Sequence, residues 1–357
     1  MYWSAFVFMS DTQIYRTQSK FTACAELLPG MEVLDLGWEG IHLTALDKTG
    51  AKVTYVTEDI RLFEKVSEHA GLTRHLESDP SRVVSGMDVV LYKPAQRAAK
   101  GQVFEWIDQG FDALCVGGKF HLAGRKDRGV ASYAKYLGQV FGNCKRVGRL
   151  GRELVFCAVK RDSVPCFRHD DGCVSFKIGD VPGGPFSVTT RPGVFSRDGL
   201  DPGTRLLIEN LDIEPMDRVL DWGCGWGALG MVGARMAYDG QVVLIDSYVR
   251  SVLCARENIE HNDCTNATVV AGDARNHQFD DAFDVIVSNP PFHEGNNAAH
   301  PLIEGAYDNL NRGGRFMLVV MRPGAYLKHM TKVFGGAGVI AEREGYSVLS
   351  ACVGTSG

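Results

Sequence analysis

Short runs of Val, Ile and Leu recur along the chain, and longer stretches with apolar residues at helical spacing separate them. The runs "VLDW" from Val219 and "VIVS" from Val285 each lead into a polar or glycine-rich turn. Continuous apolar runs of this length are typical of strands in a parallel sheet that is buried on both faces. Stretches such as "ALGMVGARMA" from Ala228 predict the covering helices, so the pattern indicates an α/β protein.

The same pattern occurs twice along the chain. The segment "EVLDLGWEG" from Glu32 resembles "RVLDWGCGWG" from Arg218, and "MDVVLYKPA" from Met87 resembles "FDVIVSNPPF" from Phe283. Three further pairs follow in the same order ("VTYVTED" and "VVLIDS", "GGKFHLAG" and "GGRFMLVV", and two copies of "VFG"), and the offset stays between 186 and 197 residues. Five similarities in register indicate a duplication. The predicted fold is two tandem doubly wound Rossmann-like α/β domains.

A polar segment without clear periodicity, "DSVPCFRHDD" (162–171), separates the two copies. The following segment, "VSFKIGDVPGGPFSVTT" from Val174, alternates like a β-hairpin around the turn "DVPGG". We therefore expect residues 1–162 to form the first domain, 163–186 a linker with a hairpin, and 187–357 the second domain.

The second copy places three glycines at alternate positions directly after its first strand: Gly223, Gly225 and Gly227. Glycine lets a ligand approach the backbone closely at the edge where open α/β sheets bind nucleotides. Asp221 precedes this loop, and Asp246 ends the next strand, where a carboxylate suits the two hydroxyls of a ribose. These features also satisfy a dinucleotide fingerprint, so NAD stays open at this point.

The residues at the ends of two later strands of the second copy distinguish between NAD and S-adenosylmethionine as the cofactor. Asp273, followed by Ala274, ends the third strand, where a carboxylate can accept from an adenine amino group. The fourth strand ends in "SNPPFHEG", which contains Asn289, Pro290 and Phe292. Acidic residues after three strands and Asn-Pro-Pro-Phe after the fourth form the arrangement of S-adenosylmethionine-dependent amino methyltransferases.

At these residues the chain resembles the bacterial ribosomal RNA guanine-N2 methyltransferases of the RsmC and RlmG type. The motifs that carry the resemblance are "RPGVFSRDGLDPGTRLLIENL" (191–211), "VLDWGCGWG", "SNPPFHEG" and "GGRFMLVV", with "GGKFHLAGRKDRG" (117–129) in the first copy. The resemblance implies S-adenosylmethionine as cofactor and ribosomal RNA as substrate, with 16S preferred over 23S. It also brings Phe195, Arg197 and Asp201 near the cofactor or the RNA, although structural roles are equally open, and it assigns no role to His293.

The Asn-Pro-Pro-Phe motif suits the chemistry of an aromatic amine. Such an amine is a weak nucleophile because its lone pair is delocalised into the ring. The Asn289 side-chain oxygen and the Pro290 carbonyl could hold its two N–H groups and direct the lone pair at a methyl group. Pro290 and Pro291 would keep the acceptors in place, and Phe292 would stack on the target base.

The first copy departs from the second where this chemistry needs it. "GWEG", with Glu39, replaces "GCGWG", and "YKPA" from Tyr92 replaces "NPPF". We therefore expect the first domain to be degenerate and to bind RNA. Eleven basic and two acidic residues lie between Lys119 and Arg161, and the candidate RNA-binding residues are Arg125, Lys126, Arg128, Lys145 and Arg146.

Bulk properties set the remaining expectations. The chain has 357 residues, 45% hydrophobic residues and a net charge of −5, but residues 1–165 carry about +3 and residues 166–357 about −8. No apolar run approaches the roughly 18–20 residues of a membrane helix. The ten cysteines contain no C-x-x-C pair and no zinc spacing, so we expect a cytoplasmic monomer without metal.

Three alternatives stay open from the sequence. Asn-Pro-Pro-aromatic motifs also serve methylation of adenine N6 or of a glutamine side chain, although a basic first domain disfavours a protein substrate. An NAD-dependent dehydrogenase would share the glycine loop. A non-catalytic RNA-binding protein is disfavoured because the second copy keeps every motif.

Overall fold

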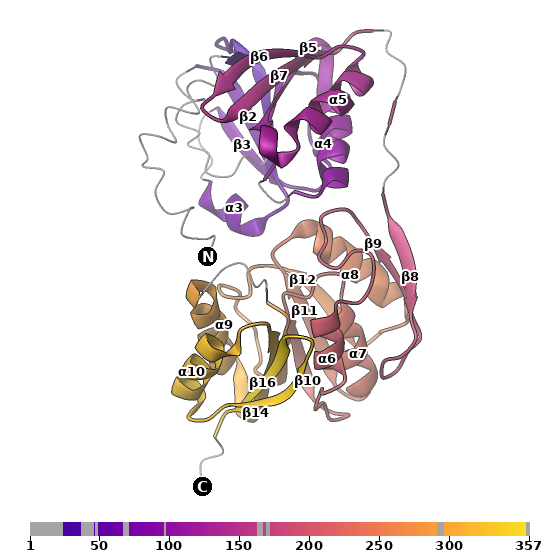
Figure 1. Cartoon of the computed structure of the whole chain (residues 1–357), viewed down its shortest axis with the longest axis vertical. Coiled ribbons are helices and arrows are strands. Elements are labelled where there is room, and N and C mark those ends of the chain that lie inside the picture. The colour runs from indigo at the N-terminus through magenta and orange to yellow at the C-terminus, as the bar shows by residue number, and fades with distance from the viewer. Residues whose placement is uncertain are drawn as a thin grey trace. The chain divides into compact units, whose positions relative to one another are not determined.

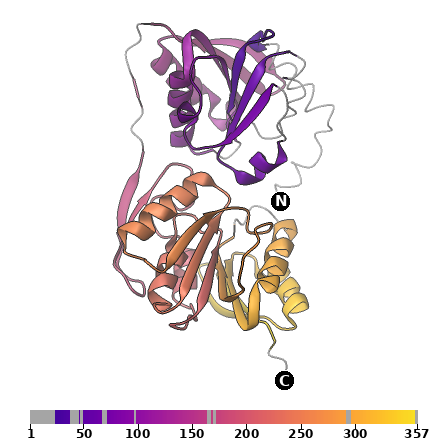
Figure 2. The same cartoon turned by 180° about the vertical axis from the view of Figure 1, so that it is seen from behind.

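The computed structural model describes residues 24–36, 46, 49–66, 71–95, 98–162, 167–168, 172–290 and 296–354. These residues divide into two compact units, one that ends at Gly172 and one that begins at Cys173. The division falls inside the segment that we predicted as linker and hairpin. Figure 1 labels the elements of both units, and Figure 2 shows them from behind.

The first unit contains a seven-stranded sheet in the order β3-β2-β1-β4-β5-β7-β6. Its strands are β1 (Glu32–Leu36), β2 (Lys52–Thr57), β3 (Leu72–Leu76), β4 (Met87–Tyr92), β5 (Leu114–Arg125), β6 (Lys145–Leu150) and β7 (Glu153–Val159). Its helices are α3 (Ile60–Lys65), α4 (Lys100–Ala113), α5 (Val130–Phe141) and the 3₁₀ turns η1 (Pro80–Arg82) and η2 (Lys126–Arg128). The first five strands are parallel, whereas β7 is antiparallel to both β5 and β6.

The second unit repeats this order as β12-β11-β10-β13-β14-β16-β15. Its strands are β10 (Arg218–Trp222), β11 (Gln241–Asp246), β12 (Ala267–Ala271), β13 (Phe283–Ser288), β14 (Leu310–Val320), β15 (Gly338–Arg343) and β16 (Tyr346–Cys352). Its helices are α6 (Pro202–Ile208), α7 (Ala228–Met236), α8 (Val249–His261), α9 (Asn296–Asp308) and α10 (Pro323–Phe334). The identical order confirms the predicted fold of two tandem Rossmann-like domains.

Helices cover both faces of the second sheet. Successive side chains of a strand point to opposite faces, so neighbouring residues of one strand pack against different helices. Val219 and Val285 pack in a core with residues of α6, α7 and α8. Leu220 and Ile286, their neighbours in sequence, pack in a separate core with residues of α9 and α10. Two buried faces explain the continuous apolar runs of β10 and β13.

A two-stranded hairpin precedes the second sheet, as predicted. Its strands β8 (Val174–Ile178) and β9 (Phe186–Thr190) are antiparallel, and Ile178 faces Phe186. The side chain of Asn258 on α8 accepts from the Thr189 N–H and donates to the Thr189 carbonyl, at 2.8 and 3.0 Å. The hairpin therefore belongs to the compact unit of the second sheet.

Candidate active site

The glycine loop follows β10, which lies between β11 and β13 in the second sheet. Asp221 on this strand is 1% exposed, and its Oδ2 accepts from the backbone N–H of Gly230 in the first turn of α7 at 2.8 Å. Its Oδ1 has no hydrogen-bond partner among the described residues. Burial and, to a lesser extent, the nearby Asp246 carboxylate raise the pKa of Asp221 to about 7, although the Gly230 hydrogen bond opposes this shift.

The three glycines after β10 adopt left-handed conformations, with φ of +79° at Gly223, +55° at Gly225 and +96° at Gly227. A Cβ added to Gly223 or Gly225 would meet no atom within 4 Å. The loop thus turns bare backbone toward open space, as close ligand approach requires. At Gly227 a Cβ would come within 3.3 Å of Leu244, so this glycine serves packing between α7 and the sheet.

Asp246 lies at the end of β11 and fixes the glycine loop. Its Oδ2 accepts from the Gly225 N–H at 2.9 Å, and its Oδ1 accepts from the Tyr248 N–H at 2.8 Å. Each carboxylate oxygen can accept more than one hydrogen bond, so a ribose diol could bind beside these contacts. Asp246 therefore has the placement that the sequence predicted for it.

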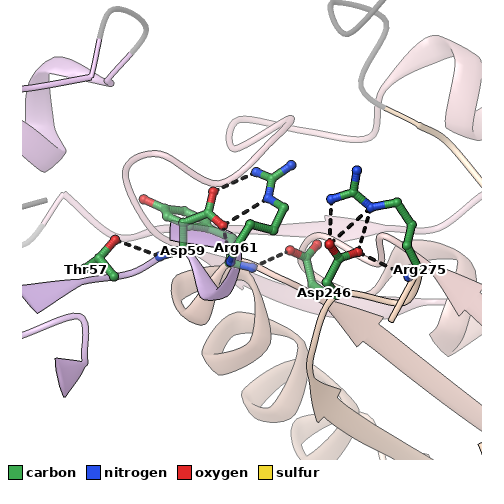
Figure 3. Close-up of polar contacts among 7 residues, drawn as sticks. Thr57, Asp59, Arg61, Asp246 and Arg275 are labelled. Atoms are coloured by element: carbon green, nitrogen blue, oxygen red, sulfur yellow. Dashed lines mark hydrogen bonds and ion pairs between the residues drawn. The ribbon is translucent and has the colours of Figure 1, made fainter. Parts of the chain in front are cut away.

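Asp273 follows β12 and is held by Arg275. The Arg275 Nε lies 2.9 Å from Oδ1, and a terminal guanidinium nitrogen lies 2.5 Å from Oδ2 (Figure 3). An adenine amino group would therefore meet a carboxylate that already binds a cation. Ala274, the next residue, is 6% exposed and packs in the core that contains Trp222 and Ile245.

Asn289 follows β13 and is half-buried. Its amide Nδ2 donates to the Thr204 Oγ1 at 2.7 Å and to the Asp201 Oδ2 at 3.1 Å. Its Oδ1 is buried and has no hydrogen-bond partner among the described residues. An unpaired buried acceptor costs about 1–3 kcal/mol, so this oxygen is poised to accept from a bound N–H group.

The other predicted residues of this motif divide into two groups. Pro290 is buried directly after Asn289. Pro291, Phe292 and His293 lie outside the described residues, as does Glu39 of the first copy. Of the residues suggested by resemblance, Phe195 is 55% exposed, the Arg197 carbonyl accepts from the Thr190 hydroxyl at 2.6 Å, and Asp201 contacts Asn289.

Sequence reasoning missed Thr204, although its hydroxyl makes the shortest contact to Asn289. The segment "DPGT" has the signature of a helix start, with Asp201 as N-cap and Pro202 in the first turn. That signature predicts the hydrogen bond from the Thr204 N–H to Asp201, which measures 2.9 Å. The signature does not indicate that the Thr204 hydroxyl also contacts Asn289, which lies 85 residues further along the chain.

The matching positions of the first unit differ from those of the second in their residues or in their hydrogen bonds. Asp35 is fully buried, burial raises its pKa to about 8, and neither oxygen has a hydrogen-bond partner among the described residues. Thr57 ends β2 at the position where Asp246 ends β11, and its hydroxyl accepts from the Asp59 N–H at 3.2 Å (Figure 3). Asp59, two residues further on, binds the Arg61 guanidinium at 2.7 Å. The registers of β4 and β13 place Lys93 at the position of Asn289, and Lys93 pairs with Glu153 at 2.9 Å.

The predicted RNA-binding residues lie on three elements of the first unit: the end of β5, η2 and β6. Lys126 and Arg128 are exposed on η2, and Lys145 and Arg146 are exposed on β6. Arg125 is different, because Asp127 binds its guanidinium at 2.6 and 3.0 Å. An open cavity of about 460 Å³ is lined by Arg125, Lys126, Asp127 and Arg152.

The helices and the metal-binding side chain types of the described residues bear on membranes and metals. None of their helices has both the length and the apolar character needed to cross a membrane. They also contain no group of three or more His, Cys, Asp or Glu side chains placed to hold a metal ion. Eight of the cysteines among them are free thiols: Cys24, Cys115, Cys144, Cys157, Cys224, Cys254, Cys264 and Cys352.

The sheet topology and the site together define a class of protein. In the dinucleotide-binding fold the strand order is 3-2-1-4-5-6, whereas here the antiparallel β16 lies between β14 and β15. This order, the glycine loop and the asparagine after the fourth strand define a Rossmann-like methyltransferase. The Methyltransferase small domain family matches residues 185–350.

Comparison with known proteins narrows the class to a family. The chain is 31% identical to ribosomal RNA small subunit methyltransferase C of Stutzerimonas stutzeri, over 74% of this chain and 79% of that protein. It is 28% identical to the protein of the same name from Shewanella pealeana, over 91% and 96%. The chain belongs to the family of ribosomal RNA small subunit methyltransferase C, as its motifs predicted.

A solved structure supports this assignment. The T. thermophilus 16S rRNA N2 G1207 methyltransferase (RsmC), solved in complex with AdoMet and guanosine, superposes with a TM-score of 0.78. The match covers 93% of this chain and 91% of that chain at 26% identity. Both units of the chain therefore take part in the similarity.

Proposed function

We propose that the protein transfers a methyl group from S-adenosylmethionine to the exocyclic N2 amine of a guanine in 16S ribosomal RNA. The unpaired, buried Oδ1 of Asn289 carries this proposal, because it offers an acceptor to an amine at the carboxyl edge of the second sheet. The names of the relatives supply the RNA and the position on the base.

The residues present fit the cofactor. S-adenosylmethionine, when bound, supplies a methyl group activated by a positively charged sulfur. The bare backbone of Gly223 and Gly225 would receive it beside Asp221, whose negative charge attracts the positive charges of the ligand, and Gly227 would keep α7 close to the loop. Asp246 would accept from the ribose, Asp273 and Ala274 would border the adenine, and Asn289 would border the methyl group.

In the proposed reaction the Asn289 Oδ1 and the Pro290 carbonyl each accept one N–H of the guanine amine. Two acceptors fix the plane of the NH₂ group, so that the nitrogen lone pair points at the methyl carbon. The new N–C bond forms as the C–S bond breaks, and the nitrogen then loses one proton to water. Phe292 would stack on the base, a contact worth about 1–3 kcal/mol.

We further propose that the first unit binds RNA and no cofactor, through Arg125, Lys126, Arg128, Lys145 and Arg146. Thr57 in place of Asp246, and Lys93, paired with Glu153, in place of Asn289, support the loss of a cofactor site there. The free thiols fit a cytoplasmic location, and a monomer without metal is part of the same proposal.

Mass-spectrometric mapping of methylated nucleotides tests the proposal. Ribosomal RNA from cells that lack the gene should lack one N2-methylguanine in 16S rRNA, and the wild-type chain should restore it. Asn289→Ala should restore none while its affinity for S-adenosylhomocysteine stays within about twofold, because the lost contact serves the amine. A missing mark in 23S rRNA, or on adenine N6, would contradict the proposed substrate.

Equilibrium binding separates the remaining classes. S-adenosylhomocysteine should bind the purified chain and NAD should not. Binding of NAD alone would support a dehydrogenase, and RNA binding with neither small molecule would support a non-catalytic protein.

A further inference from the structure

An asparagine side chain can present either its oxygen or its NH₂ group to a ligand, and the two orientations have nearly the same shape. If the Asn289 amide were turned over, its NH₂ group would face the NH₂ group of the target base. The two groups would then repel, and the acceptor would be lost. Catalysis at Asn289 therefore requires that something fixes the orientation of this amide.

The structure contains such a device on the first turn of α6. The Asp201 Oδ2 accepts from the Thr204 N–H at 2.9 Å, from the Thr204 Oγ1 at 3.4 Å and from the Asn289 Nδ2 at 3.1 Å. An ionised carboxylate accepts hydrogen bonds and cannot donate them. Asp201 therefore excludes the Asn289 oxygen from this side of the residue.

The Thr204 hydroxyl also acts as an acceptor toward Asn289. Because its hydroxyl hydrogen is directed to Asp201, its oxygen presents lone pairs to Asn289, and the Asn289 Nδ2 lies 2.7 Å away. Hydrogen bonds that run in one direction through a chain strengthen one another. Both partners of the Asn289 NH₂ group are thus acceptors, which leaves its oxygen turned away from them and unpaired.

Packing around Asp201 holds the device in place. The Tyr346 side chain of β16 also hydrogen-bonds Asp201, and burial together with the Asp201 charge raises the pKa of Tyr346. A Cβ at Gly203 would stand 2.5 Å from the Tyr346 ring. Glycine at this position therefore lets Tyr346 reach the first turn of α6.

We propose that Asp201 and Thr204 are positioning residues that set the orientation of the Asn289 amide and so present its oxygen to the target amine. This inference rests on the proposed function, because it needs an amine substrate at Asn289. Neither residue touches the substrate in this scheme, and both act through Asn289.

A matched pair at Thr204 tests the inference in the full-length protein. Thr204→Val removes the acceptor, and Thr204→Ser keeps it. With 16S ribosomal RNA or small subunits from cells that lack the gene, we expect Thr204→Val to lower kcat about tenfold, because a misplaced catalytic group commonly costs this much or more. We expect Thr204→Ser to stay near wild type, and the KM for S-adenosylmethionine to be unchanged in both.

A second variant separates positioning from helix capping. Ser is about as good an N-cap residue as Asp, so Asp201→Ser should keep α6 while its shorter side chain cannot reach Asn289. It should lower kcat at least as much as Thr204→Val and leave the thermal midpoint close to wild type. This variant also serves if Thr204→Val does not fold.

The outcomes distinguish the inference from the function on which it rests. Loss of kcat with rescue by Thr204→Ser supports it. A wild-type kcat in both Thr204→Val and Asp201→Ser overturns it. A raised KM for the RNA at unchanged kcat also overturns it, and so does a loss of kcat in Thr204→Ser equal to that in Thr204→Val. If the wild-type protein itself methylates no guanine in 16S rRNA, the proposed function fails instead.

Discussion

Asp221 illustrates how burial alone changes the chemistry of a single residue. Its carboxyl group gains one backbone hydrogen bond from Gly230, yet burial raises its pKa to about 7. Asp221 therefore takes up a proton much closer to neutral pH than an ordinary carboxyl group does when no ligand is bound. A positively charged ligand nearby would favour the ionised form and lower this pKa.

The affinity for the cofactor should therefore depend on pH. Binding that lowers the pKa of Asp221 releases a proton, so affinity rises with pH up to about 7 and levels off above it. Below pH 7, we expect the Kd of S-adenosylhomocysteine to increase by up to about tenfold per pH unit. Calorimetric titration between pH 5.5 and 8.5 measures this.

Asp221→Asn is the matched variant for the pH dependence. Asn at this position cannot ionise. The Kd of S-adenosylhomocysteine for the variant should therefore be higher than that of the wild type at pH 8 and nearly independent of pH. A wild-type Kd that stays constant from pH 5.5 to 8.5 would show that the charge of Asp221 does not contribute to cofactor binding.

At the scale of elements, the basic residues of the first unit are concentrated on η2 and β6. The contact between Arg125 and Asp127 neutralises one of the predicted charges, whereas Lys126 and Arg128 on the same turn are exposed. The two exposed side chains should therefore contribute more to binding of a polyanion than Arg125 does.

Charge reversal on η2 should weaken RNA binding in a salt-dependent way. The double variant Lys126→Glu, Arg128→Glu should lower affinity for ribosomal RNA and flatten the plot of log K against log salt by about 0.7–0.9 per lost phosphate contact. Filter binding at several salt concentrations gives the slope. The control is Lys52→Glu, which reverses a charge outside the basic segment; equal slopes for both variants would contradict the role of η2.

Sequence patterns predicted the tandem architecture and several of its parallel strands because both faces of each sheet are covered. Apolar runs such as β10 and β13, and the turns after them, follow from local propensity and burial. The direction of β7 and β16 was not predicted, since an apolar run of the same kind fits either orientation. Their antiparallel pairing with β5 and β14 depends on contacts between distant segments.

The candidate site was predictable to the same extent. Asp221, Asp246 and Asn289 each end a strand of a parallel sheet, so their meeting at one edge follows from topology. The contact of Thr204 with Asn289 and the ion pair of Arg275 with Asp273 do not follow, because they depend on side-chain orientations. Local rules explain Asp201 as a helix cap, but they do not predict its hydrogen bond with Asn289.

At the scale of the whole molecule, the duplication gives two units with separate cores and different surfaces. Each sheet has its own buried clusters on both faces, and no cluster contains residues of both units among the described parts of the chain. The acceptors and the glycine loop lie in the second unit, and the basic elements lie in the first. Cofactor binding and RNA binding should therefore be separable.

A fragment that begins at Cys173 tests this separation. It keeps the hairpin, the second sheet and every proposed cofactor residue, so its Kd for S-adenosylhomocysteine should lie within about threefold of the full chain, a free-energy difference below about 0.7 kcal/mol. Without the basic elements, its kcat/KM for ribosomal RNA should fall by at least about tenfold at physiological salt. A fragment that ends at Gly172 should bind RNA and no S-adenosylhomocysteine. If the first fragment methylates RNA as fast as the full chain, the first unit is no RNA platform, and if the second binds S-adenosylhomocysteine, its site is not vestigial.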